Sequence, residues 1–311
     1  MECKLWFVVM IIGLSLIVFD NEVLATMPKR QMMKQSLLWN ERFINQNSIS
    51  ENDEVDDSID HWAIYKAPSG NGQKRYGAMA TVSVYEIPEI KVSQFSSACI
   101  WIVNGDDGPK ENLNIITTGW TVYPDLYNDT RPHLFTDWTR DGYQTGCYNT
   151  QCSGFVLANK SKIVPGSPID QVSVYGGPQY NITLKIYKES TSGNWWLYYG
   201  SSGHHDELNA VGYWPSSLFT TLVDNASQMH FGGMVSYHKD EHGPPMGSGH
   251  YPDEGEGKAA AFYRIQAVDK IGNVYDFEDD LNAAEDKREC YRVSEFRDES
   301  FFYGGPAHCI N

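Results

Sequence analysis

The chain has 311 residues, of which 24 are basic and 40 are acidic, and its formal net charge at pH 7 is −16. A surface with this charge repels nucleic acids and anionic membranes, so functions that depend on binding either of them are excluded. Aromatic residues make up 13% of the chain, with 19 tyrosines and 9 tryptophans. Exposed members of this set could stack on sugars or on proline rings, and packing within a core is the alternative.

The first 25 residues have the pattern of a secretory signal peptide. An apolar run extends from Leu5 to Phe19, and small residues around Ala25 suit cleavage by a signal peptidase. About 15 apolar residues are too few to cross a hydrocarbon core of roughly 30 Å, so cleavage is favoured over a membrane anchor. Cleavage removes one lysine and three acidic residues and leaves 23 basic and 37 acidic residues, a net charge of −14.

Residues 26–60 are polar and charged, and they end in the acidic run from Glu51 to Asp60. This composition indicates a short leader or pro-segment outside the core. We therefore place a folded domain over residues 61–311.

Five cysteines remain after signal cleavage. Cys147 and Cys152 flank a short turn, and Cys290 and Cys309 bracket the C-terminal tail, so we predict a disulfide within each pair. Cys99 is left over in a strand-like run, where a buried, inert thiol is expected. Four glycosylation sequons agree with secretion; their asparagines are Asn128, Asn159, Asn181 and Asn225.

Alternation of β-branched and aromatic residues between Gly-rich or Pro-rich breaks predicts a series of short strands. The predicted strands are 78–85, 98–103, 118–123, 171–175, 181–188, 194–199, 229–237, 259–268 and 300–303. In the second half of the chain only 215–223 has a helical pattern, with proline in the first turn, and an amphipathic helix over 31–44 in the leader is also compatible with the sequence. Many strands with one short helix and no βαβ rhythm predict an all-β protein, an antiparallel β-sandwich.

Ten blocks of glycine and aromatic residues occur in one order between about residues 61 and 309. They are Trp62-Ala63-Ile64-Tyr65, Ile100-Trp101, Gly119-Trp120-Thr121-Val122, Leu126-Tyr127, Thr145-Gly146-Cys147-Tyr148-Asn149, Cys152-Ser153-Gly154-Phe155, Gly193-Asn194-Trp195-Trp196, Gly212-Tyr213-Trp214-Pro215, Gly247-Ser248-Gly249-His250 and Tyr303-Gly304-Gly305-Pro306. In this order the blocks resemble the plant neprosin family. The resemblance implies a neprosin-like β-sandwich, secreted to the extracellular space, the cell wall or the apoplast.

The resemblance also implies a chemistry, because the family's known activity is an acid-pH glutamic endopeptidase that cuts after proline with two glutamates. Such a dyad needs two facing carboxyl groups, one protonated and one that activates water. The family's first glutamate corresponds to Asp125 in Pro124-Asp125-Leu126-Tyr127-Asn128-Asp129, and its second to Met234 in Gly232-Gly233-Met234-Val235. Met234 cannot act as an acid or base, so the dyad is incomplete.

Other acidic residues could compensate for Met234. Glu241, or Glu254 and Glu256 in a glycine-bounded loop, could border the cleft, as could His250 and the aromatic Trp195. His238 and His242 have the spacing of a helical zinc pair, but the following Gly243-Pro244-Pro245 indicates a loop, so we predict no metal site and no cofactor.

The sequence thus predicts a secreted, neprosin-like prolyl endopeptidase scaffold whose activity is weakened or lost. Peptides or proteins, including proline-rich ones, are the expected substrates or ligands. The alternative is a secreted binding protein without catalysis, for proline-rich peptides or cell-wall polymers.

Overall fold

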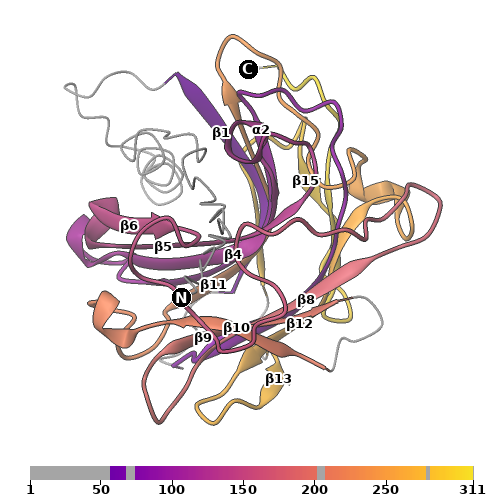
Figure 1. Ribbon diagram of the computed structural model, residues 1–311. Helices are drawn as coiled ribbons and strands as arrows, with labels where there is room; N and C mark the ends of the chain where they lie inside the picture. The colour runs from indigo at the N-terminus through magenta and orange to yellow at the C-terminus, as the bar shows by residue number, and fades with distance from the viewer. Residues whose placement is uncertain (1–56, 68–73, 202–206, 278–280, 311) are drawn as a thin grey trace, which may run out of the picture.

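Two antiparallel β-sheets stack face to face in the computed structural model, which describes residues 57–67, 74–201, 207–277 and 281–310 (Figure 1). The expected antiparallel β-sandwich is confirmed. The predicted signal peptide and nearly all of the predicted leader lie outside the described residues. No described helix is long and apolar enough to cross a membrane.

One sheet has seven strands. In spatial order they are β14 (Asn282–Glu285), β1 (Ser58–Ala67), β11 (Gln228–His238), β3 (Phe95–Asn104), β4 (Asn114–Val122), β5 (His133–Arg140) and β6 (Thr145–Tyr148). The first residue of β1, Ser58, lies three residues before the boundary predicted for the domain.

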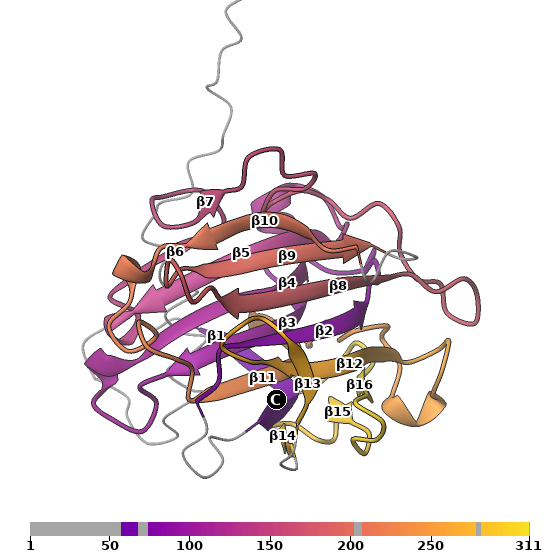
Figure 2. The same ribbon diagram turned by 90° about the horizontal axis from the view of Figure 1, so that it is seen from below.

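The other sheet has nine strands and faces the viewer in Figure 2. In order they are β15 (Arg292–Val293), β16 (Phe301–Gly304), β12 (Ala260–Val268), β2 (Gly77–Ser83), β8 (Asn181–Lys188), β9 (Trp195–Ser201), β10 (Asn209–Trp214) and β7 (Val156–Leu157), with β13 (Val274–Asp276) paired to β12. The stretch 171–175 is not a strand, which corrects one prediction; Val174 and Tyr175 are exposed there, so no sheet partner buries them.

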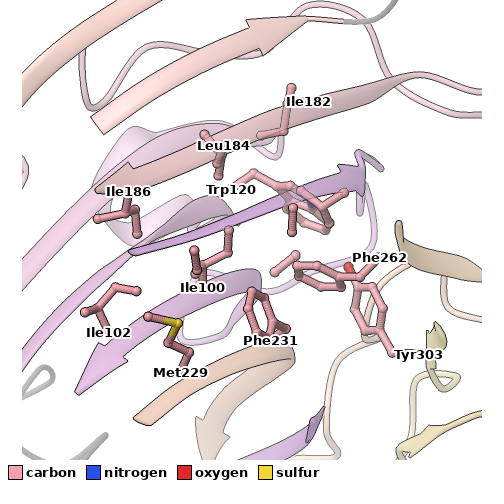
Figure 3. Close-up of a cluster of buried hydrophobic side chains, with 14 of the residues drawn as sticks. Ile100, Ile102, Trp120, Ile182, Leu184, Ile186, Met229, Phe231, Phe262 and Tyr303 are labelled. Atoms are coloured by element: carbon pink, nitrogen blue, oxygen red, sulfur yellow. The ribbon is translucent and has the colours of Figure 1, made fainter. Parts of the chain in front are cut away.

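The main core lies between the sheets and takes alternate residues from each strand (Figure 3). Ile100, Trp120 and Phe231 come from the seven-stranded sheet, and Ile182, Leu184, Ile186 and Phe262 come from the other. Side chains that alternate along a strand point to opposite faces. The period-2 pattern of the sequence is therefore the pattern of this core.

The opposite, outer face of the seven-stranded sheet holds a second buried cluster. It includes Ile64 from β1, Phe95, Cys99 and Trp101 from β3, Phe135 from β5 and Met234 from β11. A sheet face that pointed only to water would carry mostly polar residues. The outer face is instead built to hold side chains in fixed positions.

The predicted helix over 215–223 is wrong. Only a 3₁₀ turn, η3 (Ser216–Leu218), forms there, because the side-chain oxygen of Asn114 accepts hydrogen bonds from the backbone N–H groups of Thr220, Thr221 and Leu222. The one α-helix among the described residues is α2 (Pro124–Tyr127); η1 (Lys110–Asn112), η2 (Asp141–Tyr143) and η4 (Pro252–Glu254) are further 3₁₀ turns.

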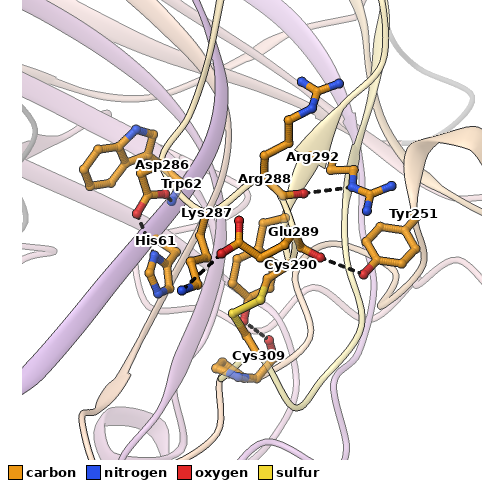
Figure 4. Close-up of a disulfide and its surroundings, with 12 residues drawn as sticks. His61, Trp62, Tyr251, Asp286, Lys287, Arg288, Glu289, Cys290, Arg292 and Cys309 are labelled. Atoms are coloured by element: carbon orange, nitrogen blue, oxygen red, sulfur yellow. Dashed lines mark hydrogen bonds and ion pairs between the residues drawn. A yellow bond between two sulfur atoms is a disulfide. The ribbon is translucent and has the colours of Figure 1, made fainter. Parts of the chain in front are cut away.

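Both predicted disulfides are confirmed, Cys147–Cys152 and Cys290–Cys309. Figure 4 shows the second one beside the edge of the seven-stranded sheet. Asp286, four residues before Cys290, lies 2.6 Å from Nδ1 of His61 and accepts a hydrogen bond from the backbone N–H of Trp62 at 2.7 Å. These contacts fasten the C-terminal tail to β1.

Candidate functional site

Met234 lies on the outer face of β11 and is 1% exposed. Its backbone neighbours are Trp62 on β1 and Ser97 on β3. Ser97 in turn pairs with Thr121 on β4, to which it donates a side-chain hydrogen bond of 2.7 Å. Met234 therefore occupies the middle of the sheet, one strand from β1 and two from β4.

The two glycines before Met234 fix its register. A Cβ atom on Gly232 would lie 2.3 Å from the carbonyl oxygen of Ala63, and one on Gly233 would lie 2.6 Å from the ring of Tyr303. Both distances are shorter than van der Waals contact, so a side chain at either position would displace the backbone of β1 or the ring of Tyr303 in the core. A shift of β11 by one residue would also exchange its two faces. Met234 is thus held on the outer face by its neighbours on both sides.

Asp125 lies in helix α2, which directly follows β4. Proline at the first position and Asn128 in the left-handed conformation begin and end this single turn. The ring of Tyr127 stacks on His133 of β5 at 3.9 Å, and its hydroxyl accepts a hydrogen bond from Asn149 at 2.9 Å. These contacts hold the turn that carries Asp125 against the outer face.

The structure brings the positions of Asp125 and Met234 to the same region. The buried outer cluster contains Met234 together with Tyr123, Leu126 and Tyr127, the neighbours of Asp125 in the chain. Met234 on β11 and Thr121 on β4 are separated by one strand, β3, so their Cα atoms are roughly 10 Å apart at the usual strand spacing. Residues distant in sequence thus converge on one end of this face.

The electrostatic environment differs between the two acids of this segment. Partial burial raises the pKa of Asp125, whose carboxylate makes no hydrogen bond or ion pair with the described residues. Burial also acts on Asp129, but the hydrogen bonds from His133 and Arg131 outweigh it and lower the pKa of that carboxyl. Asp129 is therefore a fixed anion, whereas Asp125 gains a proton more readily.

Two further carboxyl groups on the outer face were missed by the sequence analysis. Asp60 on β1 pairs with Ser236 and is the diagonal neighbour of Met234, about 7–8 Å away between Cα atoms. Asp137 on β5 pairs with Thr117 and Tyr148, and burial raises its pKa to about 7. Alternation with Trp62 would have placed Asp60 on this face, had β1 been recognised from residue 58.

The other acids proposed to compensate for Met234 lie elsewhere. Glu254 accepts hydrogen bonds from Tyr175 at 2.8 Å and pairs with His250 at 2.9 Å, and Glu256 accepts one from Tyr263 on β12 at 3.1 Å. These contacts belong to the nine-stranded sheet and its loops. Glu241 is bound by Ser93 at 2.8 Å, in the turn before β3.

Two other predicted features, Trp195 and Cys99, can be placed. Trp195 is completely buried in the main core, where its Nε1 donates to the carbonyl of Leu222, so the expectation that it borders a cleft needs correction. Trp196 is the partly exposed member of the pair. Cys99 is buried and unpaired, as expected, and burial raises its pKa well above the usual value.

The asparagines of the four sequons differ in solvent exposure. Asn128 and Asn159 are exposed, whereas Asn181 and Asn225 are partly buried. Among the described residues, no group of three or more histidine, cysteine, aspartate or glutamate side chains is arranged to hold a metal ion.

The candidate site is thus the outer face of one sheet of an antiparallel two-sheet sandwich, on which Asp60, Met234 and Asp137 lie on different strands. The sequence model of one family, Neprosin, matches residues 92–306, well over half of the chain. The chain belongs to the neprosin family.

Two crystal structures of scytalido-glutamic peptidase are similar to this chain. The first contains a transition state analog inhibitor; it has a TM-score of 0.43 and 10% sequence identity, and the match covers 79% of this chain and 98% of that one. The second contains a peptide-based transition state analog; it has a TM-score of 0.40 and 9% identity, and the match covers 80% and 99%.

Proposed function

We propose that this protein is a secreted neprosin-family member whose acid-pH, proline-directed peptidase chemistry is weakened or lost. It keeps the ability to bind proline-containing peptides on the outer face of the seven-stranded sheet. The observation that carries the proposal is Met234, which stands where the family has its second glutamate and is packed among apolar side chains. A thioether cannot move a proton.

Asp125 alone supplies part of the chemistry. Partial burial raises the pKa of Asp125, which favours the protonated form that a general acid needs. However, aspartate is one methylene shorter than glutamate, which withdraws the carboxyl group by roughly 1.3–1.5 Å. A displacement of about 1 Å can reduce a rate about 100-fold, and loss of one of two cooperating groups removes most of the activity.

The test is cleavage of an internally quenched peptide with a single proline between pH 3 and 5. The native protein is compared with Met234→Glu, Asp125→Glu/Met234→Glu and the matched control Asp125→Glu/Met234→Gln, in which the second side chain has the same size but no titratable proton. We expect cleavage after proline only with the double glutamate variant. The buried surroundings of position 234 would raise the pKa of the introduced carboxyl group and keep it protonated in acid.

Cleavage by the native protein would refute the loss of chemistry. Asp60→Asn and Asp137→Asn variants would then show which carboxyl group on the outer face has replaced the glutamate. Lack of cleavage by every variant, with the peptide still bound, would favour the non-catalytic alternative in which other features of the face have also changed.

A further inference from the structure

A cavity of about 520 Å³ lies at one end of the nine-stranded sheet. Its lining comes from the start of β8, the end of β9, the start of β10 and the segment 161–171. The segment is fixed to the other sheet, because the backbone N–H of Leu134 on β5 donates to the carbonyl of Ser167 at 2.9 Å. The backbone N–H of Ile169 likewise donates to the carbonyl of Pro132 at 2.8 Å. The cavity thus lies between three strand ends and a loop that is held in place.

The lining combines apolar side chains with neutral polar groups. Ile169 and Ile182 belong to the main core, and Tyr199 packs partly against it. Burial, with a smaller effect of Asp170, raises the pKa of Tyr199 to about 12, so its hydroxyl keeps its proton and can donate as well as accept. Other amide and hydroxyl groups of the lining belong to Gln171, Asn181, Ser201 and Asn209. The charged lining residues are all exposed; they are Lys162, Asp170 and Glu207.

This lining suits a sugar ring. Its volume is within the roughly 300–1,000 Å³ of small-molecule sites. A pyranose ring has apolar C–H faces and hydroxyl groups along its edge, and each hydroxyl both donates and accepts. Neutral amide and hydroxyl side chains do the same, so they match such an edge better than they match an ion.

The chain carries its own attachment point for a sugar on the cavity wall. Asn181 lines the cavity as the first residue of β8, and Asn181-Ile182-Thr183 is one of the four sequons. Thr183 is completely buried, and its hydroxyl shares a hydrogen bond of 2.8 Å with that of Thr81. The sequon is therefore accessible only before the sheet forms. A glycan added at that stage is already present when the cavity closes.

We infer that Asn181 carries an N-linked glycan whose first sugar, N-acetylglucosamine, occupies this cavity. The donor is a lipid-linked oligosaccharide pyrophosphate of the secretory pathway. A bond forms between Nδ2 of Asn181 and C1 of the sugar, the bond from C1 to the pyrophosphate oxygen breaks, the amide loses one proton, and the lipid pyrophosphate leaves. The inference rests on secretion, which is one part of the proposed function.

Covalent attachment makes a modest affinity sufficient. A single sugar binds proteins weakly in solution, but a tethered one is present at an effective concentration in the millimolar range or above. Its contacts with the cavity exist only in the folded protein, so they stabilise that state. The sugar covers the apolar side chains of Ile169, Ile182 and Tyr199 at the open end of the core.

The experiment uses the mature chain, residues 26–311, exported through a foreign signal peptide from cells that make only high-mannose glycans. Glycopeptide mass spectrometry measures occupancy at Asn181. Endoglycosidase H trims each glycan to its first sugar, and we expect the trimmed protein to keep its thermal unfolding midpoint. Asn181→Gln should lower that midpoint by at least about 3 °C, whereas Asn128→Gln and Asn159→Gln should change it by less than about 1 °C.

Two controls separate the sugar from the asparagine. Native protein and Asn181→Gln made without glycosylation in a bacterial periplasm should unfold at the same temperature, and Thr183→Ser, which keeps the sequon, should stay glycosylated. Peptide N-glycosidase should release the Asn181 glycan from folded protein about ten times more slowly than the Asn159 glycan, because the linkage is protected until the cavity opens.

Three results would each overturn the inference: an unoccupied Asn181 in exported protein, equal midpoints of glycosylated native protein and Asn181→Gln, or loss of the stabilisation on trimming to one sugar. Failure of the native signal peptide to export the chain would instead refute secretion. Peptide cleavage by the native protein would refute the proposed loss of chemistry and would not affect this site.

Discussion

Asp137 is a buried carboxyl group with an unusual proton affinity. It is 3% exposed, and one of its oxygens has no hydrogen-bond partner among the described residues. Burial raises its pKa to about 7, against a small opposing effect of the backbone N–H of Trp138. Replacement by asparagine keeps the shape and removes the titration.

The direction of the effect follows from the two pKa values. Below pH 4 the carboxyl is protonated in both the folded and the unfolded chain, so the full stability is present. Between about pH 4 and pH 7 the unfolded chain releases the proton while the folded protein keeps it, and the free energy of unfolding falls as the pH rises. About three pH units at roughly 1.36 kcal/mol each give a loss of about 4 kcal/mol by pH 7.

We expect Asp137→Asn to remove this dependence, so that the variant gains stability relative to the native protein as the pH rises. The measurement is urea unfolding of both proteins at pH 4, 5.5 and 7, with Asp107→Asn as an exposed control. The reasoning is refuted if the two proteins differ by the same free energy at all three pH values.

Two further predictions concern stability. Asn114→Ala should lower the free energy of unfolding by at least about 2–3 kcal/mol, because three backbone N–H groups lose their acceptor. A change below about 1 kcal/mol, measured by urea unfolding, would show that water readily replaces the lost side-chain oxygen as the acceptor. Loss of Cys290–Cys309, which closes a 19-residue separation, should cost roughly 3 kcal/mol and loss of Cys147–Cys152, across 5 residues, roughly 2 kcal/mol. Serine variants of each pair, compared under oxidising conditions, test this order, and a larger cost for the shorter loop would contradict the loop-entropy argument.

The candidate site could be predicted in part. The order of the neprosin-like sequence blocks identified Asp125 and Met234 as the positions of the family's two glutamates. The structure places the segments that carry these two residues on one face of the seven-stranded sheet. Asp60 could have been assigned to that face by its alternation with Trp62, but only if β1 had been recognised from residue 58. Asp137 could not be assigned, because the face to which it points depends on the pairing of β5 with β4 and β6. For the same reason, Glu254 and Glu256 could not be assigned to the other sheet from local sequence.

The sequence by itself determined eight of the nine predicted strands, the β-sandwich class and both disulfides, because alternation and cysteine position are local properties; it did not reveal β1, β5 or β10. It also determined that position 234 lacks a titratable group, since residue identity alone decides this. Only the tertiary structure decided that Trp195 is buried while Trp196 faces outward, and that 215–223 does not form a helix. The physical reason is that face and hydrogen-bond partner depend on strand pairing and on distant side chains, here Asn114, which no local pattern records.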